Sequence, residues 1–427
     1  MDRRRFLQIT SSTFGTISAF GSIAAQFWAN AAFAHEEKGT APAKSVVFVW
    51  LNGGPSHIDT FDPKPGVKEG GPFKAIHSRT SGMHLSEHLP LLAEASGSFT
   101  LIRSINSREG NHVRAQYLGH TGYAPNPTVL HPSLGSWLSQ RLADASAELP
   151  LFVSVGGPSY GGGFLGVEHN PLVITKAGDL PENVALGLGV SRERFDHRLA
   201  ALATLEDRFA KSLLDKKIDG RRSVYGKSVR MMLSPKREVF DLSAEPDATL
   251  KRYGDHDFGR GCLLARRLVE QGTRCVEVVL DGWDTHRDNF DKVKKLSHML
   301  DGGLSGLLHD LEARNLLKST LVVCLGDFGR TPAINGNDGR DHHPAASFAL
   351  VAGGGLRAGL VVGETDDRGG KVTRDLIKLA DLYATLAVQL GLDPSEMSMT
   401  PAGRPIAMTD NGEPMKALLV PSSPSAN

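Results

Sequence analysis

Short apolar runs rich in β-branched residues alternate along the chain with segments of helical periodicity. A run of this kind, bounded by turn residues, is typical of a strand buried on both faces of a parallel sheet. The predicted strands cover residues 45–51, 99–103, 151–155, 172–175, 274–280, 320–325 and 348–352. The predicted helices cover about residues 86–95, 112–118, 134–142, 258–271, 289–313 and 374–390. This alternation predicts an α/β domain with a mostly parallel central sheet and helices on both faces.

Residues 35–415 are predicted to form this single domain, with one helical insertion. The span from about residue 192 to 236 is charged, has helical periodicity and contains no strand pattern. It is interpreted as a lid, a subunit contact or a simple cover for the sheet. Residues 416–427 contain the stretch Pro-Ser-Ser-Pro-Ser and are predicted to form a disordered tail.

The first 34 residues are predicted to be a twin-arginine signal peptide. Residues 2–8, Asp-Arg-Arg-Arg-Phe-Leu-Gln, match the export pattern, and a mildly apolar stretch rich in Ser, Gly and Ala follows. Residues 32–34, Ala-Phe-Ala, form a cleavage site, with residues 29–31, Ala-Asn-Ala, as an alternative. The expected partner is therefore the twin-arginine export machinery, and the expected location is the periplasm. Secretion is an alternative, and an uncleaved signal would leave the protein membrane-associated.

Charge and cysteine content narrow the classes of protein further. The formal net charge is +1, so no strong field favours nucleic acid or an anionic membrane surface as a partner. No segment after the signal peptide reads as apolar enough to span a bilayer. Cys262, Cys275 and Cys324 are odd in number and lie among apolar neighbours, which predicts buried free thiols rather than disulfides.

Acidic and histidine side chains follow two of the predicted strands, at the sheet edge where ligands bind in open α/β folds. Asp281, Asp284 and His286 come directly after the strand at residues 274–280. Asp284 and His286 are two residues apart, so their side chains can point the same way in an extended loop. Either aspartate can be the partner of His286 in a metal site. The alternative is a loop aspartate that caps the helix predicted near residue 289.

A second group follows the strand at residues 320–325. Asp327 lies at the end of this apolar run, where a lone carboxylate is costly unless it is paired or binds a cation. Arg330 can pair with it, or can bind an anionic substrate with its planar guanidinium. His342 and His343 follow in a loop bounded by glycine and proline, and at least one of them is expected to reach the site.

Two more histidines are candidates near the amino end. His57 and Asp59 follow the first strand in a glycine-rich loop that can approach a ligand closely, with a tight turn and capping side chains as the alternative. His112 precedes a predicted helix whose free N–H groups would attract an anion. Together the acids and histidines predict a divalent cation site. Zn²⁺, Ca²⁺, Mg²⁺ and Mn²⁺ are all candidates.

The joint order of several motifs resembles that of a large uncharacterised family. The motifs are Gly-Gly-Pro-Ser-His-Ile-Asp-Thr-Phe-Asp-Pro-Lys-Pro (53–65), Leu-Leu-Ala-Arg-Arg-Leu-Val-Glu (263–270), Gly-Trp-Asp-Thr-His (282–286), Asp-Phe-Gly-Arg-Thr-Pro (327–332) and Gly-Arg-Asp-His (339–342). Members of that family are twin-arginine-exported, sulfatase-like proteins of the alkaline phosphatase superfamily. The resemblance spans about residues 45–370 and implies an alkaline-phosphatase-like three-layer α/β/α sandwich.

The resemblance also implies metal ligands at the ends of several strands. In this sequence they resemble Asp281 or Asp284, His286, Asp327 and His342, so His342 is preferred over its neighbour.

The sequence departs from the superfamily pattern at three points. Phe328 stands where histidine is usual, and Asn52 ends the first strand where an aspartate ligand would be expected, with Asp59 or His57 as a candidate replacement. No Cys-x-Pro-x-Arg motif is present, so the formylglycine nucleophile of the common sulfatases is absent. The resemblance places the nucleophile near residues 111–112, where a histidine can attack covalently, act as a base or bind metal.

The sequence thus predicts an exported, metal-dependent hydrolase of a sulfate or phosphate ester. Its partner would be an anionic small-molecule or polysaccharide ester substrate. The predicted metal ligands are Asp59, Asp281 or Asp284, His286, Asp327 and His342. Arg330 would stabilise the anion, and His57 or His112 would move a proton. The alternative is a non-catalytic binding or assembly protein on a degenerate scaffold, which Phe328 and the missing nucleophile favour.

Overall fold

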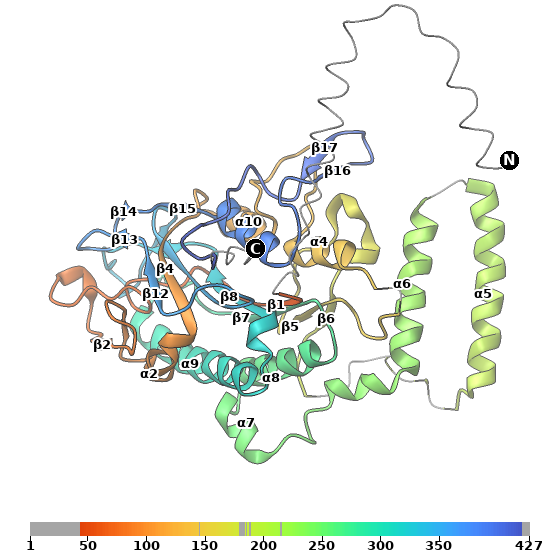
Figure 1. Ribbon diagram of the computed structural model, residues 1–427, viewed down its shortest axis with the longest axis horizontal. Helices are drawn as coiled ribbons and strands as arrows, with labels where there is room; N and C mark the ends of the chain where they lie inside the picture. The colour runs from red at the N-terminus through yellow and green to blue at the C-terminus, as the bar shows by residue number, and fades with distance from the viewer. Residues whose placement is uncertain are drawn as a thin grey trace, which may run out of the picture. The chain divides into compact units, whose positions relative to one another are not determined.

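The computed structural model describes residues 43–144, 146–178, 184, 186–187, 189–213 and 216–420 (Figure 1). The predicted signal peptide, residues 1–34, lies outside the described residues, so export stays a prediction. Within the described part of the chain, no helix is long and apolar enough to cross a membrane.

A nine-stranded sheet, mostly parallel, forms the centre of the domain. Its order is β12-β4-β11-β8-β1-β7-β5-β6, and β15 also pairs with β4. Only β11 runs antiparallel to its neighbours within this described sheet. The strands are β1 (Ser45–Leu51), β4 (Phe99–Asn106), β5 (Phe152–Val155), β6 (Leu172–Ile174), β7 (Cys275–Leu280), β8 (Thr320–Gly326), β11 (Ser347–Gly353), β12 (Leu360–Val362) and β15 (Ile377–Lys378). Each strand predicted from the sequence is present.

Helices cover both faces of this sheet, which confirms the predicted three-layer α/β/α architecture (Figure 1). All seven residues of β1 are buried, and alternate ones belong to different hydrophobic clusters. Val47 and Val49 pack in the cluster with α8 (Asp257–Glu270) and α9 (Asn289–Ala313). Phe48 and Trp50 pack in the cluster with the opposite layer, which contains α4 (Leu134–Arg141) and α10 (Leu379–Gln389).

Two predicted helices have different boundaries in the structure. The segment predicted at 86–95 contains α2 (Pro90–Glu94), which begins at a proline, and is preceded by strand β3 (His84–Ser86). The segment predicted at 374–390 begins with strand residues, and α10 follows them. Proline is well suited to the first helical turn, which explains the late start of α2.

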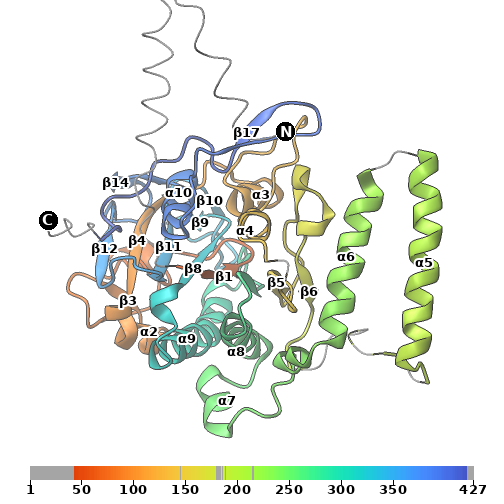
Figure 2. The same ribbon diagram turned by 45° about the vertical axis from the view of Figure 1, so that its right-hand side comes forward.

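The remaining elements are short or lie outside the sheet. They are β2 (Ala75–His77), α3 (His112–Thr121), α5 (Arg192–Leu213), α6 (Lys216–Leu233), α7 (Asp247–Tyr253), β9 (Gly329–Arg330), β10 (His342–His343), β13 (Glu364–Thr365), β14 (Val372–Arg374), β16 (Met397–Met399) and β17 (Pro405–Ala407), with 3-10 turns at Lys68–Gly70, Ala95–Ser98, Gly163–Leu165, Val167–His169, Pro235–Phe240 and Leu317–Ser319. The predicted helical insertion corresponds to α5 and α6, which run side by side (Figure 2).

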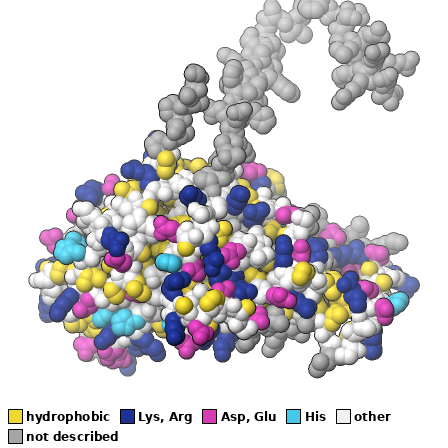
Figure 3. Space-filling model, turned by 60° about the horizontal axis from the view of Figure 1, so that its bottom comes forward, with side chains coloured by type: hydrophobic (Ala, Val, Ile, Leu, Met, Phe, Trp, Pro, Cys, Tyr) yellow, Lys and Arg dark blue, Asp and Glu magenta, His cyan; other side chains and the backbone are white. Residues whose placement is uncertain are grey.

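The surface charges and the cysteines agree with the sequence predictions, whereas the predicted start of the C-terminal tail does not. Lys and Arg side chains intermingle with Asp and Glu on the face shown in Figure 3. The three cysteines are buried and free, as predicted. The predicted start of the tail at residue 416 is too early, because Leu418 is fully buried and Leu419 bridges to Leu356.

Asp301 links two helices of one layer and makes stability depend on pH. It extends from α9 and accepts hydrogen bonds from the backbone N–H groups of Leu91 (3.0 Å) and Leu92 (2.8 Å) in the first turn of α2. Burial raises the pKa of Asp301 to about 6, although the two backbone N–H donors oppose the shift. An acid with a raised folded-state pKa favours folding when protonated, so its contribution is lost as pH rises through 6.

We predict that the free energy of unfolding of the wild type falls relative to that of D301N by about 2 kcal/mol between pH 4 and pH 7. Asparagine keeps an acceptor for the helix and does not ionise, so the difference isolates the carboxyl group. Urea denaturation at several pH values would measure it. A difference that does not change with pH would contradict the prediction.

Candidate metal centre

The candidate site lies where the loops after β1, β7 and β8 meet at the carboxyl ends of these strands. Gly53 has a φ of +112°, and a Cβ at this position would lie 2.5 Å from the backbone nitrogen of Asp284. Only glycine therefore allows the β1 loop to pack this closely on the β7 loop. The β9–β10 hairpin and the first residue of α3 complete the site. The side chain of Asn111 caps α3 by accepting the N–H of Arg114, which places His112 at the helix start.

The imidazoles of His112 and His342 are each held at Nδ1 by an acceptor. His112 Nδ1 lies 2.6 Å from Oδ2 of Asp327, and His342 Nδ1 lies 2.8 Å from the carbonyl oxygen of Gly110. A carbonyl and a carboxylate only accept, so Nδ1 is the donor in both rings. Each Nε2 then carries a lone pair. Nε2 of His112 is buried and has no hydrogen-bond partner.

His286 is oriented in the same way by a third acceptor. Its Nδ1 lies 2.8 Å from Oδ1 of Asp341. Its Nε2 lies 2.9 Å from Nε2 of His342. With both Nδ1 atoms donating elsewhere, two lone pairs face each other, which is favourable only with a proton or a cation between them.

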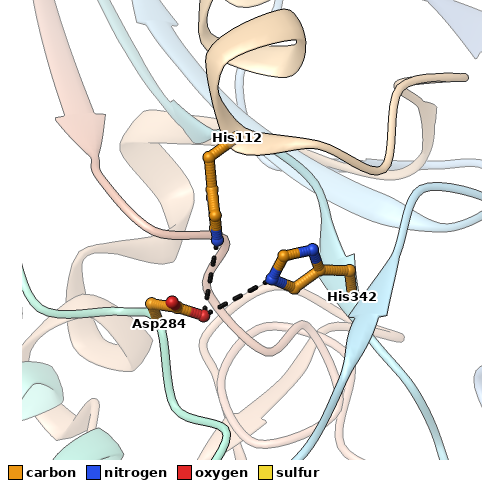
Figure 4. Close-up of side chains that lie close together, drawn as sticks. All are labelled: His112, Asp284 and His342. Carbon is orange, nitrogen blue, oxygen red and sulfur yellow. Dashed lines mark ion pairs between the residues drawn. The ribbon is translucent and has the colours of Figure 1, made fainter.

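Asp284 is the carboxylate on which the three imidazoles converge. Its Oδ1 lies 3.4 Å from Nε2 of His112, 3.2 Å from Nε2 of His286 and 3.5 Å from Nε2 of His342. Ligand atoms of His112, Asp284 and His342 all lie within 4.8 Å of one another (Figure 4). Two imidazole nitrogens and one carboxylate oxygen thus form a candidate donor set for a transition metal, and Nε2 of His286 lies close to the same carboxylate oxygen. The residues therefore fit a divalent cation.

Burial, hydrogen bonds and nearby charges shift the pKa values of these groups in different directions. The hydrogen bond to Asp327 raises the pKa of His112 despite its partial burial. Burial lowers the pKa of His342. Burial alone would raise the pKa of Asp284, but the hydrogen bond and charge of Arg330 more than offset it and lower the pKa. The hydrogen bond from His286 is the main cause of the lowered pKa of Asp341.

Arg330 lies beneath the site, and its side chain is fully buried. Its Nη2 donates to Oδ1 of Asp284 at 2.6 Å. Nε donates to the carbonyl of Gly54, and Nη1 donates to the carbonyl of Arg340. The guanidinium thus holds Asp284 and the loop backbones in place, and its predicted contact with an anion stays a prediction.

The point where the imidazoles of His112, His286 and His342 meet Asp284 is called the convergence point below. Asp327 and Asp281 lie beside it and contact other groups. Oδ2 of Asp327 also accepts from Gln116 Nε2 at 3.3 Å, and Oδ1 accepts from the backbone N–H of Gly53 at 3.4 Å. Asp281 accepts a 2.8 Å hydrogen bond from Asn52 Nδ2. Of the two aspartates between which the sequence could not choose, the structure places Asp284 with the histidines.

The structure places Asp59 and His57 away from the three imidazoles. Asp59 forms a fully buried, bidentate ion pair with Arg340, at 2.7 and 2.9 Å, and also accepts from Asn289 and Ser56. This pairing satisfies the carboxylate without a metal ion.

His57 is also buried, and its Nε2 lies 2.7 Å from the carbonyl of Gly369. Burial lowers the pKa of His57 to about 4. Burial thus favours the neutral form of the His57 imidazole at pH 7.

Sequence reasoning missed Asp341 and Gly110 as orienting groups. Asp341 directly precedes His342 in the Gly-Arg-Asp-His motif, so its position next to a predicted ligand could have indicated a role at the site. A backbone carbonyl leaves no signal of this kind.

Phe328 is fully buried, and its ring centroid lies 4.9 Å from that of His112 and 4.6 Å from that of His342. It packs as an apolar floor under the two rings.

Residues 43–419 match the family model described as "Protein of unknown function (DUF1501)". The chain therefore belongs to this family. It matches none of the curated proteins.

Several solved structures resemble the chain at low identity. The PsFucS1 sulfatase from Pseudoalteromonas sp. is 14% identical, with a TM-score of 0.40 over 87% of this chain and 71% of that one. The C-terminal periplasmic domain of EcEptC from Escherichia coli, in complex with Zn, is 13% identical, with a TM-score of 0.35 over 90% and 93%. A TAB5 alkaline phosphatase mutant with Mg bound is 10% identical, with a TM-score of 0.33 over 75% and 95%. At these scores the similarities carry no argument about activity.

We predict that R340M lowers the free energy of unfolding by about 3–5 kcal/mol, because Asp59 then remains buried without its charged partner. Denaturant unfolding measures this loss, and the double variant D59N/R340M should recover part of it. R192M is the matched control, since the Arg192–Asp196 pair is 58% and 50% exposed and should change stability by less than about 1 kcal/mol. Equal effects of R340M and R192M would contradict a structural role for the buried pair.

Proposed function

We propose that this member of the DUF1501 family is an exported, metal-dependent hydrolase of a sulfate or phosphate ester. The observation that carries the proposal is the convergence of three imidazole Nε2 atoms on one carboxylate oxygen of Asp284, at 3.2–3.5 Å. Each imidazole is locked at Nδ1 by a separate acceptor. Outer acceptors of this kind are typical of histidines that bind metal.

The donor set favours particular metals. His112, His286 and His342 would each bind through Nε2, and Asp284 through a carboxylate oxygen. Imidazole suits Zn²⁺ and other transition ions, whereas Ca²⁺ and Mg²⁺ prefer oxygen ligands. We therefore propose Zn²⁺, with one ion per chain. Such an ion polarises an ester oxygen or lowers the pKa of a bound water.

The protein groups around the site support attack by water on the ester. Among the described residues, no serine, threonine or cysteine side chain hydrogen-bonds to His112, Asp284, His286 or His342. Thr285 is fully buried and donates to Asn289. We infer that the chain orients the reactants and supplies no covalent nucleophile of the hydroxyl or thiol type. Asp284 is 48% exposed, which leaves the convergence point open to a substrate.

A second candidate function is metal-dependent binding without turnover. It is favoured by Phe328, whose apolar ring takes up the space beneath two of the histidines. Among the described residues, no lysine and no arginine other than the buried Arg330 forms an ion pair with Asp284. Such a protein would hold the ion and bind an anionic ligand, but would release no product.

We predict that purified full-length protein binds one Zn²⁺ per chain and that H342A lowers its affinity for Zn²⁺. The loss should exceed the roughly 10–100-fold caused by removing an outer partner of a metal ligand. Elemental mass spectrometry and titration with Zn²⁺ measure stoichiometry and affinity. Chelation should abolish release of sulfate or phosphate from a panel of esters.

Two neighbours serve as matched controls for this experiment. His343 follows His342 directly, but its Nε2 contacts the carbonyl of Gly370. Asp281 is close to Asp284 in sequence, but contacts Asn52. H343A and D281N should therefore keep the Zn²⁺ that H342A and D284N lose. Metal-free wild type would refute the metal site, whereas a Zn²⁺-loaded protein without turnover on any ester would favour the binding function.

A further inference from the structure

We propose that Asp327 is a positioning residue that acts on the metal site through His112 and does not itself bind the ion. This inference rests on the proposed metal site and specifies how its first histidine is kept ready to bind. It differs from the expectation drawn from the sequence, in which Asp327 was a ligand.

Both carboxylate oxygens of Asp327 are committed to protein donors. Oδ2 contacts His112 Nδ1 at 2.6 Å and accepts from Gln116 Nε2 at 3.3 Å, while Oδ1 accepts from the N–H of Gly53 at 3.4 Å. The side chain is fully buried at the end of β8. These three donors already occupy both oxygens of this buried carboxylate. They also satisfy a charge that would otherwise be costly to bury.

The contact with Asp327 fixes both the tautomer and the orientation of His112. With its proton on Nδ1, the ring has its lone pair on Nε2, which is buried without a hydrogen-bond partner and lies 3.4 Å from Asp284. The rings of Phe328 and His342 pack on His112 at centroid distances of 4.9 and 4.3 Å. The imidazole is therefore restrained by packing and by one strong, charge-assisted hydrogen bond.

The donors of Asp327 are themselves held by a small polar network. Nε2 of Gln116 also donates to Oδ1 of Asn52 at 2.8 Å, and Asn52 donates to Asp281. Asn52 directly follows β1, at the position where the family resemblance led us to expect a ligand carboxylate. Its amide instead helps to keep Gln116 directed at Asp327.

Asp341 provides a natural comparison on the other side of the site. It contacts His286 Nδ1 at 2.8 Å, so the chemistry of the bond is the same. Its side chain is 56% exposed, whereas that of Asp327 is fully buried. A hydrogen bond to a carboxylate is stronger where water is excluded. Loss of the carboxylate charge should therefore weaken metal binding more at Asp327 than at Asp341.

A double-mutant cycle on full-length protein tests the proposal. Zn²⁺ affinity would be measured by competition with a chromophoric chelator for wild type, D327N, H112A, D327N/H112A and D341N. We expect D327N to bind Zn²⁺ about 10–100-fold more weakly than wild type, and D341N to lose less. If Asp327 acts through His112, the double variant should match H112A to within roughly twofold.

Independent losses that multiply in the double variant would overturn the proposal, because a direct ligand contributes without His112. Unchanged affinity in D327N would overturn it as well. Wild type that binds no Zn²⁺ would refute the proposed function itself, a distinct result.

A second measurement does not depend on metal or on the stability of H112A. ¹⁵N NMR of histidine-labelled, metal-free protein at alkaline pH should show His112 protonated at Nδ1, and this preference should weaken in D327N. A His112 protonated at Nε2 in the wild type would contradict the inferred orientation.

Discussion

The guanidinium of Arg330 is the group on which the arrangement of the site depends, because it contacts every strand-end loop that meets there. Its donors reach the carbonyls of Gly53 and Gly54 after β1, the carbonyl of Trp283 and the carboxylate of Asp284 after β7, and the carbonyl of Arg340 in the hairpin. A planar, permanently charged fork with five donors suits this task. A buried charge of this kind is tolerated only because its donors are matched by acceptors.

Around this centre, the polar groups divide into those that face the convergence point and those that hold them. The Nε2 atoms of His112, His286 and His342 are directed at one oxygen of Asp284, an arrangement that is more favourable with a bound cation or added protons. Asp327, Asp341 and the backbone near Gly110 stand behind the imidazoles. Ligand atoms are thus concentrated at the convergence point, and the acceptors behind the imidazoles hold these rings in orientation. This is expected of a pre-organised binding site.

Much of the fold could be predicted because its strands are buried on both faces. The continuous apolar run of β1 and the 25-residue periodic segment of α9 leave little ambiguity, and both have the predicted boundaries. The site was harder to predict, because a carboxylate at a strand end looks the same whatever its partner is. Asp59 pairs with Arg340, which is 281 residues away, and Asp327 pairs with His112, which is 215 residues away. Only the tertiary structure separates these aspartates from Asp284, which accepts from Arg330 but also lies within 3.5 Å of three imidazole nitrogens.

The spacing of the converging groups along the chain has a consequence for biosynthesis. His112 follows β4, Asp284 and His286 follow β7, and His342 lies in the hairpin after β8. Parallel strands of this kind come together only after long loops have closed. A nascent chain that has not yet reached residue 342 therefore lacks the complete donor set, so the proposed metal would bind late in folding. An ion bound at this point would stabilise the folded domain, because its binding free energy is available only to chains whose central sheet has already assembled.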